Sequence, residues 1–396
     1  MRVLSVTAQK PCSTGSGVYL TEVVRSLAKM GVSQAVVAGV TREDRVDMPE
    51  GVTVYPVYFS SEKLPYPVVG MSDEMPYTST RYRDMTEEMA GQFKAAFLEV
   101  LDEAIEKENP DIILCHHLYY LTALIRAHYP AKKVYGFCHN TDLRQMESIS
   151  FEKNFIRQEI PKLDRIFALQ EAQKEKIKKI YPVSEKQMTV IGTGYNSEVF
   201  KKTGIKLSRK DGKIRMIFAG KITQKKGVKS FLRALNLLDY EKEKIQLILA
   251  GGAGNLVEYE EIKELADGCR YPVVFAGCVT QSRLAELYND CDIFVLPSMY
   301  EGLPLTVIES LACGDRVVMT KLEGIAEWLA DMVPDADIRY VLPPGMKGTD
   351  EPLEEELPAF ESRLTEALRE AIEEKDTKEC DVSRISWQKI AREVIR

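Results

Sequence analysis

The sequence predicts an α/β protein built from two Rossmann-like, doubly wound domains. Short apolar runs alternate with longer segments of helical periodicity along almost the whole chain. This alternation is typical of parallel sheets that are covered by helices on both faces. A polar, basic stretch at Lys201–Lys213 interrupts the alternation and is predicted to be the linker between two such series. A chain of 396 residues is long enough for two domains of ordinary size.

The first half of the chain contains six predicted strands, each a short run rich in β-branched and other apolar residues. The segments between them carry helical patterns that start near Ser16, Thr86, Tyr119, Phe151 and Glu171. The six strands are expected at Val3–Val6, Ala35–Ala38, Val52–Val57, Ile112–Cys115, Val134–Phe137 and Ile166–Leu169.

The second half repeats this pattern. The helix expected after Gly227 has an apolar stripe at helical spacing, from Val228 to Leu238. Doubly wound sheets bind ligands at the carboxyl ends of their strands, so we expect a ligand in the cleft between the two domains. The five strands of this half are expected at Ile214–Ala219, Ile245–Ala250, Val273–Ala276, Ile293–Leu296 and Val317–Met319.

Composition and charge exclude several classes of protein. A net charge of −7 argues against a nucleic-acid binder, which usually carries a basic field. No apolar run is long enough to span a bilayer, and the first residues predict a strand rather than a signal peptide. Eight scattered cysteines and four histidines form no cluster with zinc spacing. We therefore expect a cytoplasmic protein with reduced thiols and without a bound metal.

The most informative stretch of the chain follows the predicted strand Ile293–Leu296. A loop beginning Pro297-Ser298 leads to a helix predicted over Pro304–Cys313. The loop amides and the positive end of this helix can hold an anion. Two carboxylates, Glu301 and Glu309, frame that position and suit the hydroxyls of a sugar and a ribose. An anion site with hydroxyl acceptors beside it describes a site for a nucleotide sugar.

This stretch resembles the Glu-x7-Glu signature of the retaining GT-B glycosyltransferases of the family 4 type (glycosyl transferases group 1). The resemblance implies that Glu301 contacts hydroxyls of the donor sugar and that Glu309 binds the ribose. It also implies that Gly302-Leu303-Pro304-Leu305 lies at the donor diphosphate. The alternative interpretation is an ordinary strand–loop–helix with two surface glutamates.

Two lysines follow the first strand of the second half, in the segment Phe218–Gly227. The family has Arg and then Lys at the matching positions, both pairing with the donor diphosphate. Here Lys221 replaces the arginine, which removes the bidentate fork and leaves a point charge. The resemblance therefore implies a diphosphate-binding role for Lys226 and a weaker one for Lys221. A solvated basic loop is the alternative.

The first half carries further matches to the family. Gly15-Ser16-Gly17 resembles its glycine-rich loop near the donor phosphate, although Leu20 replaces the third glycine of a dinucleotide fingerprint, and a tight turn is the alternative. His139-Asn140-Thr141-Asp142 is similar to the family's His-Gly-Thr-Asp segment, whose histidine reaches the sugar and the leaving group. His116 and His117 also end a strand, and one of them is expected to contact the acceptor.

Two weaker matches complete the resemblance, and two Asp-x-Asp sequences are discounted. The backbone of Phe275–Val279, including Val279, is expected to contact the nucleobase. Ser386–Ala391 resembles the C-terminal helix that returns to the first domain. Two Asp-x-Asp sequences, Asp290–Asp292 and Asp335–Asp337, match a metal motif in letters only, since the first precedes a buried strand instead of following one.

Together these matches predict a metal-independent, retaining glycosyltransferase without a cofactor, which moves a sugar from a nucleotide diphosphate to an acceptor hydroxyl. His139, Lys226 and Glu301 are its predicted catalytic residues. A UDP-sugar is the first expected donor and GDP-mannose the second. The acceptor is a sugar, a lipid-linked molecule or a small molecule, in polysaccharide, glycolipid or glycoside synthesis. Neither the oligomeric state nor a membrane contact is indicated.

Two other functions stay open at this point. One is a nucleotide-sugar epimerase or hydrolase of GT-B fold, and the other is a Rossmann dehydrogenase. The predicted domains are 1–198 for the acceptor, 199–376 for the nucleotide sugar, and a returning helix in 377–396. The stretch Ser60–Arg83 is rich in proline and tyrosine and is predicted to be a long, functional or mobile loop. It is the segment expected to select the acceptor, and whether it binds the acceptor stays open.

Overall fold

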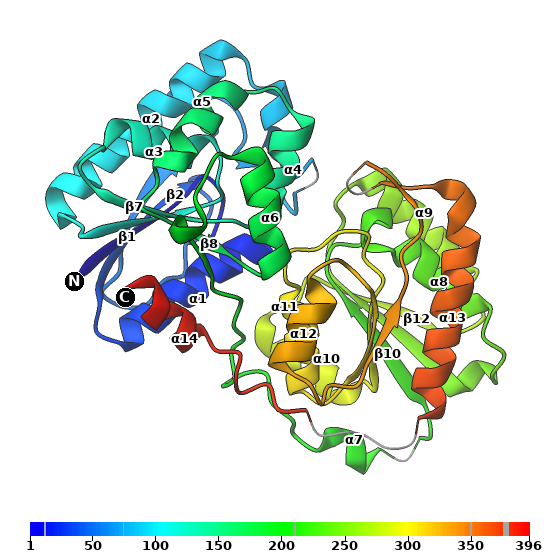
Figure 1. The fold of residues 1–396 in the computed structure, drawn as a ribbon. Helices are drawn as coiled ribbons and strands as arrows, with labels where there is room; N and C mark the ends of the chain where they lie inside the picture. The colour runs from blue at the N-terminus through cyan, green and yellow to red at the C-terminus, as the bar shows by residue number, and fades with distance from the viewer. Residues whose placement is uncertain (12, 74, 210, 349–350, 375–379) are drawn as a thin grey trace. The chain divides into compact units, whose positions relative to one another are not determined.

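A computed structural model describes residues 1–11, 13–73, 75–209, 211–348, 351–374 and 380–396. The chain divides into two compact units (Figure 1). Unit 1 contains Met1–Gly194 together with Ser386–Arg396, and unit 2 contains Tyr195–Ile385. The chain thus enters unit 2 shortly before the predicted 198/199 boundary, and the predicted 376/377 boundary lies outside the described residues.

Unit 1 is built on a seven-stranded parallel sheet with the order β3-β2-β1-β6-β7-β8-β9. All six strands expected in this half are confirmed to within a few residues. Strand β9 was missed because three residues at a sheet edge carry too little pattern. The strands are β1 (Arg2–Thr7), β2 (Ser33–Val40), β3 (Thr53–Tyr58), β6 (Ile112–His116), β7 (Lys133–Phe137), β8 (Arg165–Ala168) and β9 (Met188–Val190).

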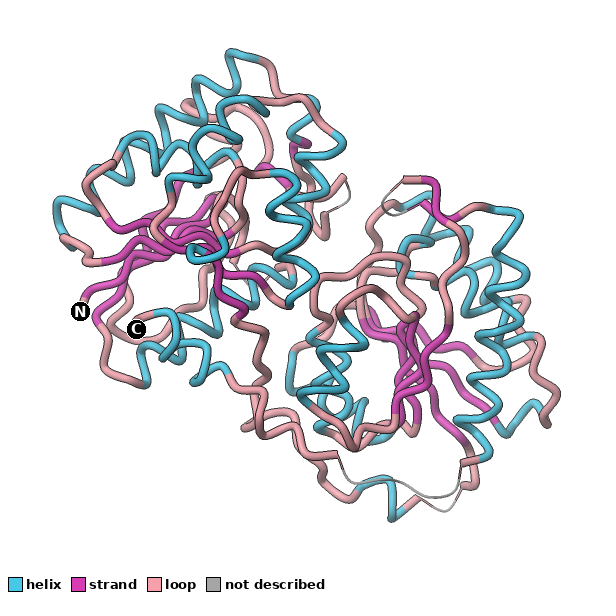
Figure 2. Tube along the Cα trace, in the orientation of Figure 1, coloured by secondary structure: helices cyan, strands magenta, loops and turns pink. Residues whose placement is uncertain are grey.

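Helices lie on both faces of this sheet (Figures 1 and 2). Helix α1 begins at Gly15, where the Thr14 side chain accepts a hydrogen bond from the Gly17 amide. Gly15-Ser16-Gly17 therefore forms the first turn of the helix that was expected to start near Ser16, and its place near a donor phosphate stays a prediction. The helices of unit 1 are α1 (Gly15–Lys29), α2 (Glu87–Glu108), α3 (Tyr120–His128), α4 (Thr141–Ser148), α5 (Lys153–Glu159), α6 (Glu171–Ile180) and α14 (Trp387–Val394).

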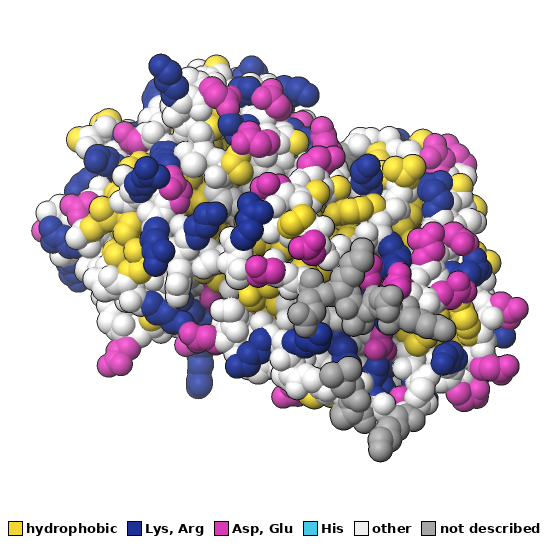
Figure 3. All heavy atoms as spheres, turned by 60° about the horizontal axis from the view of Figure 1, so that its bottom comes forward, with side chains coloured by type: hydrophobic (Ala, Val, Ile, Leu, Met, Phe, Trp, Pro, Cys, Tyr) yellow, Lys and Arg dark blue, Asp and Glu magenta, His cyan; other side chains and the backbone are white. Residues whose placement is uncertain are grey.

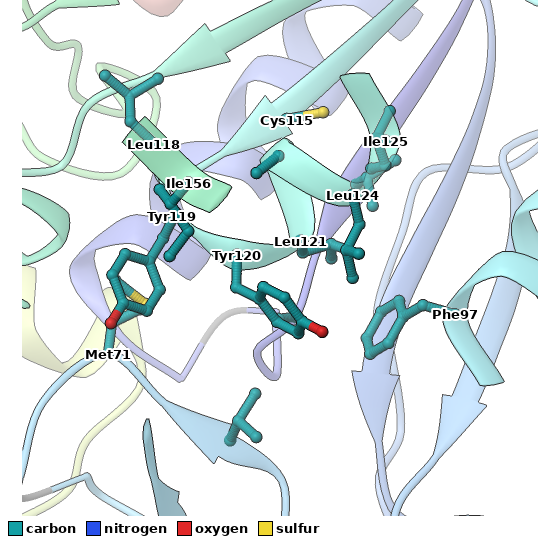
Figure 4. Packing of buried hydrophobic residues seen from close by; sticks show 14 of the residues in the cluster. Met71, Phe97, Cys115, Leu118, Tyr119, Tyr120, Leu121, Leu124, Ile125 and Ile156 are labelled. Carbon is teal, nitrogen blue, oxygen red and sulfur yellow. The ribbon is translucent and has the colours of Figure 1, made fainter. Parts of the chain in front are cut away.

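The predicted loop Ser60–Arg83 is more ordered than its composition suggested. It contains the short strands β4 (Val69–Gly70) and β5 (Thr80–Arg81), and a 3-10 turn, Tyr82–Asp84, begins within it. Figure 4 shows Met71 from this segment in the same apolar cluster as Tyr119 and residues of α3. Because its aromatic and methionine side chains fill the core, the segment behaves as part of unit 1 and not as a free loop.

Unit 2 has a six-stranded parallel sheet with the order β12-β11-β10-β13-β14-β15. The five strands expected here are confirmed, and β15 was missed. The strands are β10 (Ile214–Ala219), β11 (Ile245–Ala250), β12 (Val273–Gly277), β13 (Ile293–Leu296), β14 (Arg316–Thr320) and β15 (Ile338–Val341), with a small pair β16 (Met346–Lys347) and β17 (Glu351–Pro352). The helices are α7 (Ile205–Ser208), α8 (Val228–Asn236), α9 (Leu256–Asp267), α10 (Gln281–Asp290), α11 (Leu305–Ala312), α12 (Ile325–Met332) and α13 (Leu357–Glu373).

The predicted linker, Lys201–Lys213, is wrong as a description of this segment. Two of its basic residues are paired with aspartates further along unit 2, with Lys206 Nζ 2.5 Å from Asp315 Oδ1 and Arg209 2.5 Å from Asp292. The segment therefore lies along unit 2 as a strap. Composition could not show this, because a lysine-rich linker and a lysine-rich strap differ only in the residues that they contact.

Helix α14 packs against α1 within unit 1. The Trp387 ring meets the Tyr19 ring edge to face, with centroids 4.9 Å apart. A Cβ at Gly194 would lie 2.5 Å from Trp387, so only glycine fits there. None of the described helices combines the length and the apolar composition that crossing a membrane requires. On the face drawn in Figure 3, basic and acidic side chains are interspersed.

Candidate active site

In unit 2, strands β10 and β13 are neighbours and their following loops touch. Gly227 has φ of 74°, and a Cβ at this position would lie 2.0 Å from the Pro297 carbonyl oxygen. The Met299 amide donates to the Lys225 carbonyl at 3.0 Å. Only glycine permits such a close approach of the two loops, which places the lysine segment directly against the segment that leads to Glu301.

The contact brings two of the predicted catalytic side chains together. Lys226 Nζ lies 2.6 Å from Glu301 Oε1, and both side chains are mostly buried. Lys226 ends a 3-10 turn, Gln224–Lys226, and its amide donates a hydrogen bond to the side chain of the N-cap residue Thr223 at 3.3 Å. Lys221 follows Gly220 at the end of β10 and is partly exposed. The cation and the carboxylate therefore share one point at the carboxyl edge of the sheet.

Helix α11 carries the second motif glutamate. It begins at Leu305 with Pro304 as its N-cap, so the predicted start at Pro304 and end at Cys313 are each one residue too wide. Gly302 and Leu303 precede this helix, and Leu303 is buried. Glu309 is only 6% exposed, which is unusual for a carboxylate and contradicts the interpretation as a surface glutamate.

The loops after β11 and β12 also meet at this edge. A Cβ at Gly251 would lie 1.7 Å from the Gly220 carbonyl oxygen, and one at Gly252 would lie 2.8 Å from the Cys278 sulfur. Val279, predicted to lie near the nucleobase, follows and is partly exposed. Because these positions are glycine, the loops that follow β10, β11, β12 and β13 can approach one another closely at this edge of the sheet.

One residue at this edge was missed by sequence reasoning. Glu258 of α9 accepts a hydrogen bond from the Gln224 amide at 2.6 Å and so anchors the turn that carries Lys226. Its charge-assisted bond is stronger than a neutral one. No signal in the sequence distinguished Glu258 from the other acidic residues of α9, because the contact depends on a helix more than thirty positions away.

In unit 1 the three predicted histidines form one cluster. His116 ends β6, and His139 follows β7, its neighbour in the sheet. His116 Nδ1 lies 3.0 Å from His139 Nε2, and their rings are stacked with centroids 5.2 Å apart. The His117 ring lies 4.9 Å from that of His139. Tyr19, which was not predicted, packs against both His116 and His139.

Asp142 holds the two strand ends together. Its Oδ2 accepts hydrogen bonds from the Leu118 amide at 2.7 Å and from the His139 amide at 3.3 Å. Asn140, between His139 and Asp142, has φ of 73° and ψ of −39°, which lies outside the left-handed helical region that asparagine tolerates. Glycine adopts such a conformation most readily, which explains why the resembling family has glycine at this position.

Burial keeps the cluster uncharged. Desolvation, followed by the neighbouring His117, lowers the pKa of His116 to about 3. Desolvation also lowers the pKa of His117 and holds the pKa of His139 well below its ordinary range, where the two other imidazoles contribute. All three rings are therefore neutral at pH 7, so they can orient polar groups but carry no positive charge for a phosphate.

These low pKa values predict that unit 1 is acid-sensitive. Below about pH 6.5 these histidines bind a proton in the unfolded chain but stay unprotonated in the folded state. The free energy of unfolding therefore falls as the pH drops through 6.5. His116 alone should lower it by about 2 kcal/mol at pH 5. Urea unfolding followed by Trp387 fluorescence in a Trp328→Phe background measures this loss. His116→Asn should flatten the pH dependence and His128→Asn should not; equal slopes in both would contradict the assignment.

Carboxylates of both Asp-x-Asp sequences are paired with arginines. Asp292 accepts from the Arg215 amide at 2.8 Å and pairs with Arg209, and Asp337 pairs with Arg339 at 2.6 Å. In the part of the chain that the structure describes, no group of three His, Cys, Asp or Glu side chains could hold a metal ion. The seven described cysteines are free thiols.

Comparison with known families covers nearly the whole chain. The family described as Glycosyltransferase Family 4 matches residues 13–199, and the family described as Glycosyl transferases group 1 matches residues 200–393. An uncharacterized glycosyltransferase of Methanocaldococcus jannaschii is 28% identical over 172 residues, which cover 41% of this chain and 44% of that protein. D-inositol 3-phosphate glycosyltransferase 2 of Catenulispora acidiphila is 25% identical over 347 residues, or 80% and 76% of the two chains. Several relatives, including the first, are matched over less than half of their own length.

Solved structures share the fold. Sucrose-phosphate synthase of Thermosynechococcus elongatus is similar with a TM-score of 0.70 and 15% identity, covering all of this chain and 97% of that one. HepE of Anabaena, solved in complex with UDP and glucose, is similar with a TM-score of 0.64 and 15% identity, covering 100% and 98%. At this identity the likeness establishes two Rossmann-like domains of the GT-B kind.

Proposed function

The chain belongs to the group 1 glycosyl transferases of GT-B fold, and on that premise we propose that it is a retaining glycosyltransferase that uses a nucleotide-sugar donor. It transfers the sugar to an acceptor hydroxyl without a metal ion. A UDP-sugar is the first donor to test, because HepE, which has the same fold, was solved with UDP and glucose. GDP-mannose is the second.

The proposal rests on one observation, the contact between Lys226 and Glu301. Their segments lie far apart in the sequence, and the structure brings Lys226 Nζ to 2.6 Å from Glu301 Oε1 at the ends of adjacent strands. An ammonium group has three N–H donors, so Lys226 can keep Glu301 and still donate to a phosphate oxygen. In this arrangement Lys226 contacts both the carboxylate that binds the sugar and the diphosphate. It therefore lies beside the sugar–phosphate bond that the reaction breaks.

The chemistry that fits this arrangement is a front-face substitution. The bond between the anomeric carbon and the diphosphate oxygen breaks, and the bond to the acceptor oxygen forms on the same face. The acceptor proton passes to the leaving phosphate oxygen. Lys226 and the amides before α11 stabilise the negative charge that develops on that oxygen. Glu301 is committed to Lys226 and to sugar hydroxyls, so it does not serve as a nucleophile here.

Unit 1 supplies the acceptor side of the proposal. His117 is buried, has a lowered pKa and follows β6 at the carboxyl edge of the sheet, where polar groups that orient a hydroxyl are expected. His116 points its Nδ1 at His139 and has its Nε2 buried, so of the two it is His117 that we assign to the acceptor. The acceptor class stays broad because the relatives differ widely. They include an N-acetylgalactosaminyltransferase of Campylobacter jejuni whose name specifies a diphospho-undecaprenol and a galactosylglucosyldiacylglycerol synthase of Streptococcus pneumoniae.

Product analysis tests the proposed function. The chain is incubated with each of UDP-glucose, UDP-galactose, UDP-N-acetylglucosamine and GDP-mannose, with and without a panel of sugar and glycolipid acceptors. Transfer is expected for one donor, and NMR of the new anomeric carbon should show the donor configuration retained. An inverted product would refute retention, and release of free sugar that no acceptor diverts would indicate a hydrolase.

The two motif glutamates should have separable effects. Glu309→Ala should weaken the binding of free UDP by about 1–3 kcal/mol, because buried ribose hydroxyls lose their acceptor. Glu301→Ala should leave the affinity for free UDP unchanged and reduce sugar transfer. Isothermal titration with UDP and a transfer assay measure the two effects. Equal losses of UDP affinity in both variants would show that the division of roles is wrong.

Chelation should leave turnover unchanged. Lys226 already supplies a cation at the expected diphosphate position, and Asp290, Asp292 and Asp337 of the Asp-x-Asp sequences are paired with arginines. The assay compares initial rates with excess EDTA and with added magnesium or manganese. A loss of most turnover with EDTA that either metal restores would overturn the proposal of metal independence.

A further inference from the structure

The contact between His116 and His139 determines where each ring carries its proton. Both rings are neutral at pH 7, and a neutral imidazole has one N–H and one lone pair. Because His116 Nδ1 lies 3.0 Å from His139 Nε2, one of these two nitrogens donates to the other. The choice between them also sets the protonation of the remaining nitrogen on each ring.

Two arrangements satisfy this hydrogen bond. In the first, His116 donates from Nδ1, so its Nε2 is a lone pair and His139 carries its own proton on Nδ1. In the second, His139 donates from Nε2, so its Nδ1 is a lone pair and His116 must carry its proton on Nε2. The two arrangements present opposite chemistry at the free nitrogen of His139.

The surroundings of His116 Nε2 distinguish the two arrangements. This nitrogen is buried and has no hydrogen-bond partner among the described residues. The His116 ring stacks on Phe137, with centroids 4.8 Å apart, and the Tyr19 ring lies edge-on to it. A proton on Nε2 would be an orphaned buried donor, and folded proteins avoid orphaned N–H groups more strictly than orphaned acceptors. The first arrangement is therefore favoured.

We propose that His116 is a positioning residue that holds His139 in the tautomer with its proton on Nδ1. His139 then offers an N–H donor to a ligand instead of a lone pair. If the proposed function holds, the substrate atom that His139 meets is an acceptor, such as an oxygen of the donor sugar or of the leaving phosphate. A general-base role for His139, in which it would remove the acceptor's proton, is excluded by this tautomer.

NMR of ¹⁵N-histidine-labelled protein tests the inference without any substrate. The chain has four histidines, so the two-bond ¹H–¹⁵N spectrum has few signals, and single substitutions assign them. At pH 7.5 the wild type should show His139 protonated on Nδ1. His116→Leu removes the donor, and His139 should lose that preference. His116→Asn places an amide N–H near the former Nδ1 and should restore it, while His128→Asn should change nothing at His139.

The inference is overturned if wild-type His139 carries its proton on Nε2, or if His116→Leu and His116→Asn give the same His139 tautomer. A transfer assay adds a second readout. His116→Leu should lower kcat by about tenfold to a hundredfold, as expected when a polar group is misoriented, and His116→Asn should recover most of it. A confirmed tautomer without any transfer activity would refute the proposed function and leave the role of His116 intact.

Discussion

Lys226→Ala is expected to reduce turnover at saturating donor by two to three orders of magnitude. The diphosphate gains negative charge as the sugar leaves, so a fixed cation stabilises the transition state more than the ground state. A unit charge about 4 Å away contributes on the order of 4 kcal/mol at the effective dielectric of a partly wet site. Measured losses for single stabilisers of this kind are roughly 3–4 kcal/mol. The loss in kcat should therefore exceed the loss in nucleotide affinity.

A matched control separates this effect from a general loss of charge. Lys229 lies three residues further on, in α8, and its Nζ pairs with Glu261 of α9 at 2.5 Å instead of with Glu301. Lys229→Ala removes the same charge from the same segment and should leave turnover nearly normal. Lys221→Ala should have an intermediate effect. If Lys226→Ala keeps more than about a tenth of the normal rate, the leaving-group role is wrong.

His139→Ala should lower turnover by about a hundredfold or more, within the range for oriented polar groups that act on a reacting centre. His139 follows β7, is held by Asp142 through its backbone and is paired with His116 through its ring. Because its pKa lies well below its ordinary value, the ring is neutral throughout the range in which such enzymes are assayed. The pH–rate profile of the wild type should therefore lack a step near pH 6.5 from this residue.

Loss of folding must be separated from loss of function in this variant. His139 packs against Tyr19, His116 and His117, so its removal also loosens the core of unit 1. Melting curves of wild type and His139→Ala identify conditions in which both are folded, and rates are compared only there. A folded variant with a near-normal rate would transfer the role to His116 or His117.

The architecture was predictable because parallel strands with two covered faces leave a strong signal. A buried strand such as β13 is a continuous apolar run, and the order of the strands along the chain follows from the alternation with helices. The short edge strand β9 was not predicted from the sequence, because it has only three residues and is partly exposed. The packing of Lys201–Lys213 along unit 2 was not predicted either, because its partners, Asp292 and Asp315, lie far along the chain.

The residues of the candidate site could be proposed from the sequence, but the contacts between them could not. The sequence placed Lys226, Glu301 and His139 after strands, and residues that follow parallel strands gather at one edge of their sheet. Which of them touch depends on strand register and on loop approach. The pairing of His116 with His139 requires the register of β6 on β7, and the pairing of Lys226 with Glu301 requires the Gly227–Pro297 contact. Neither contact can be inferred from the spacing of the residues in the sequence. The functional roles of these residues stay predictions.

The discontinuity of unit 1 has a consequence for the order in which the protein acquires its structure during synthesis. Helix α14, which covers Tyr19 on α1, leaves the ribosome only after all of unit 2, Tyr195–Ile385, has been made. At roughly 5–20 residues per second, synthesis of the chain from the end of α1 to α14 takes on the order of 20–70 s, and α14 does not cover α1 until then. During that interval the Tyr19 face of α1 is open to other apolar surfaces. Nascent chains arrested just before Ser386 should therefore bind chaperones more strongly than released chains.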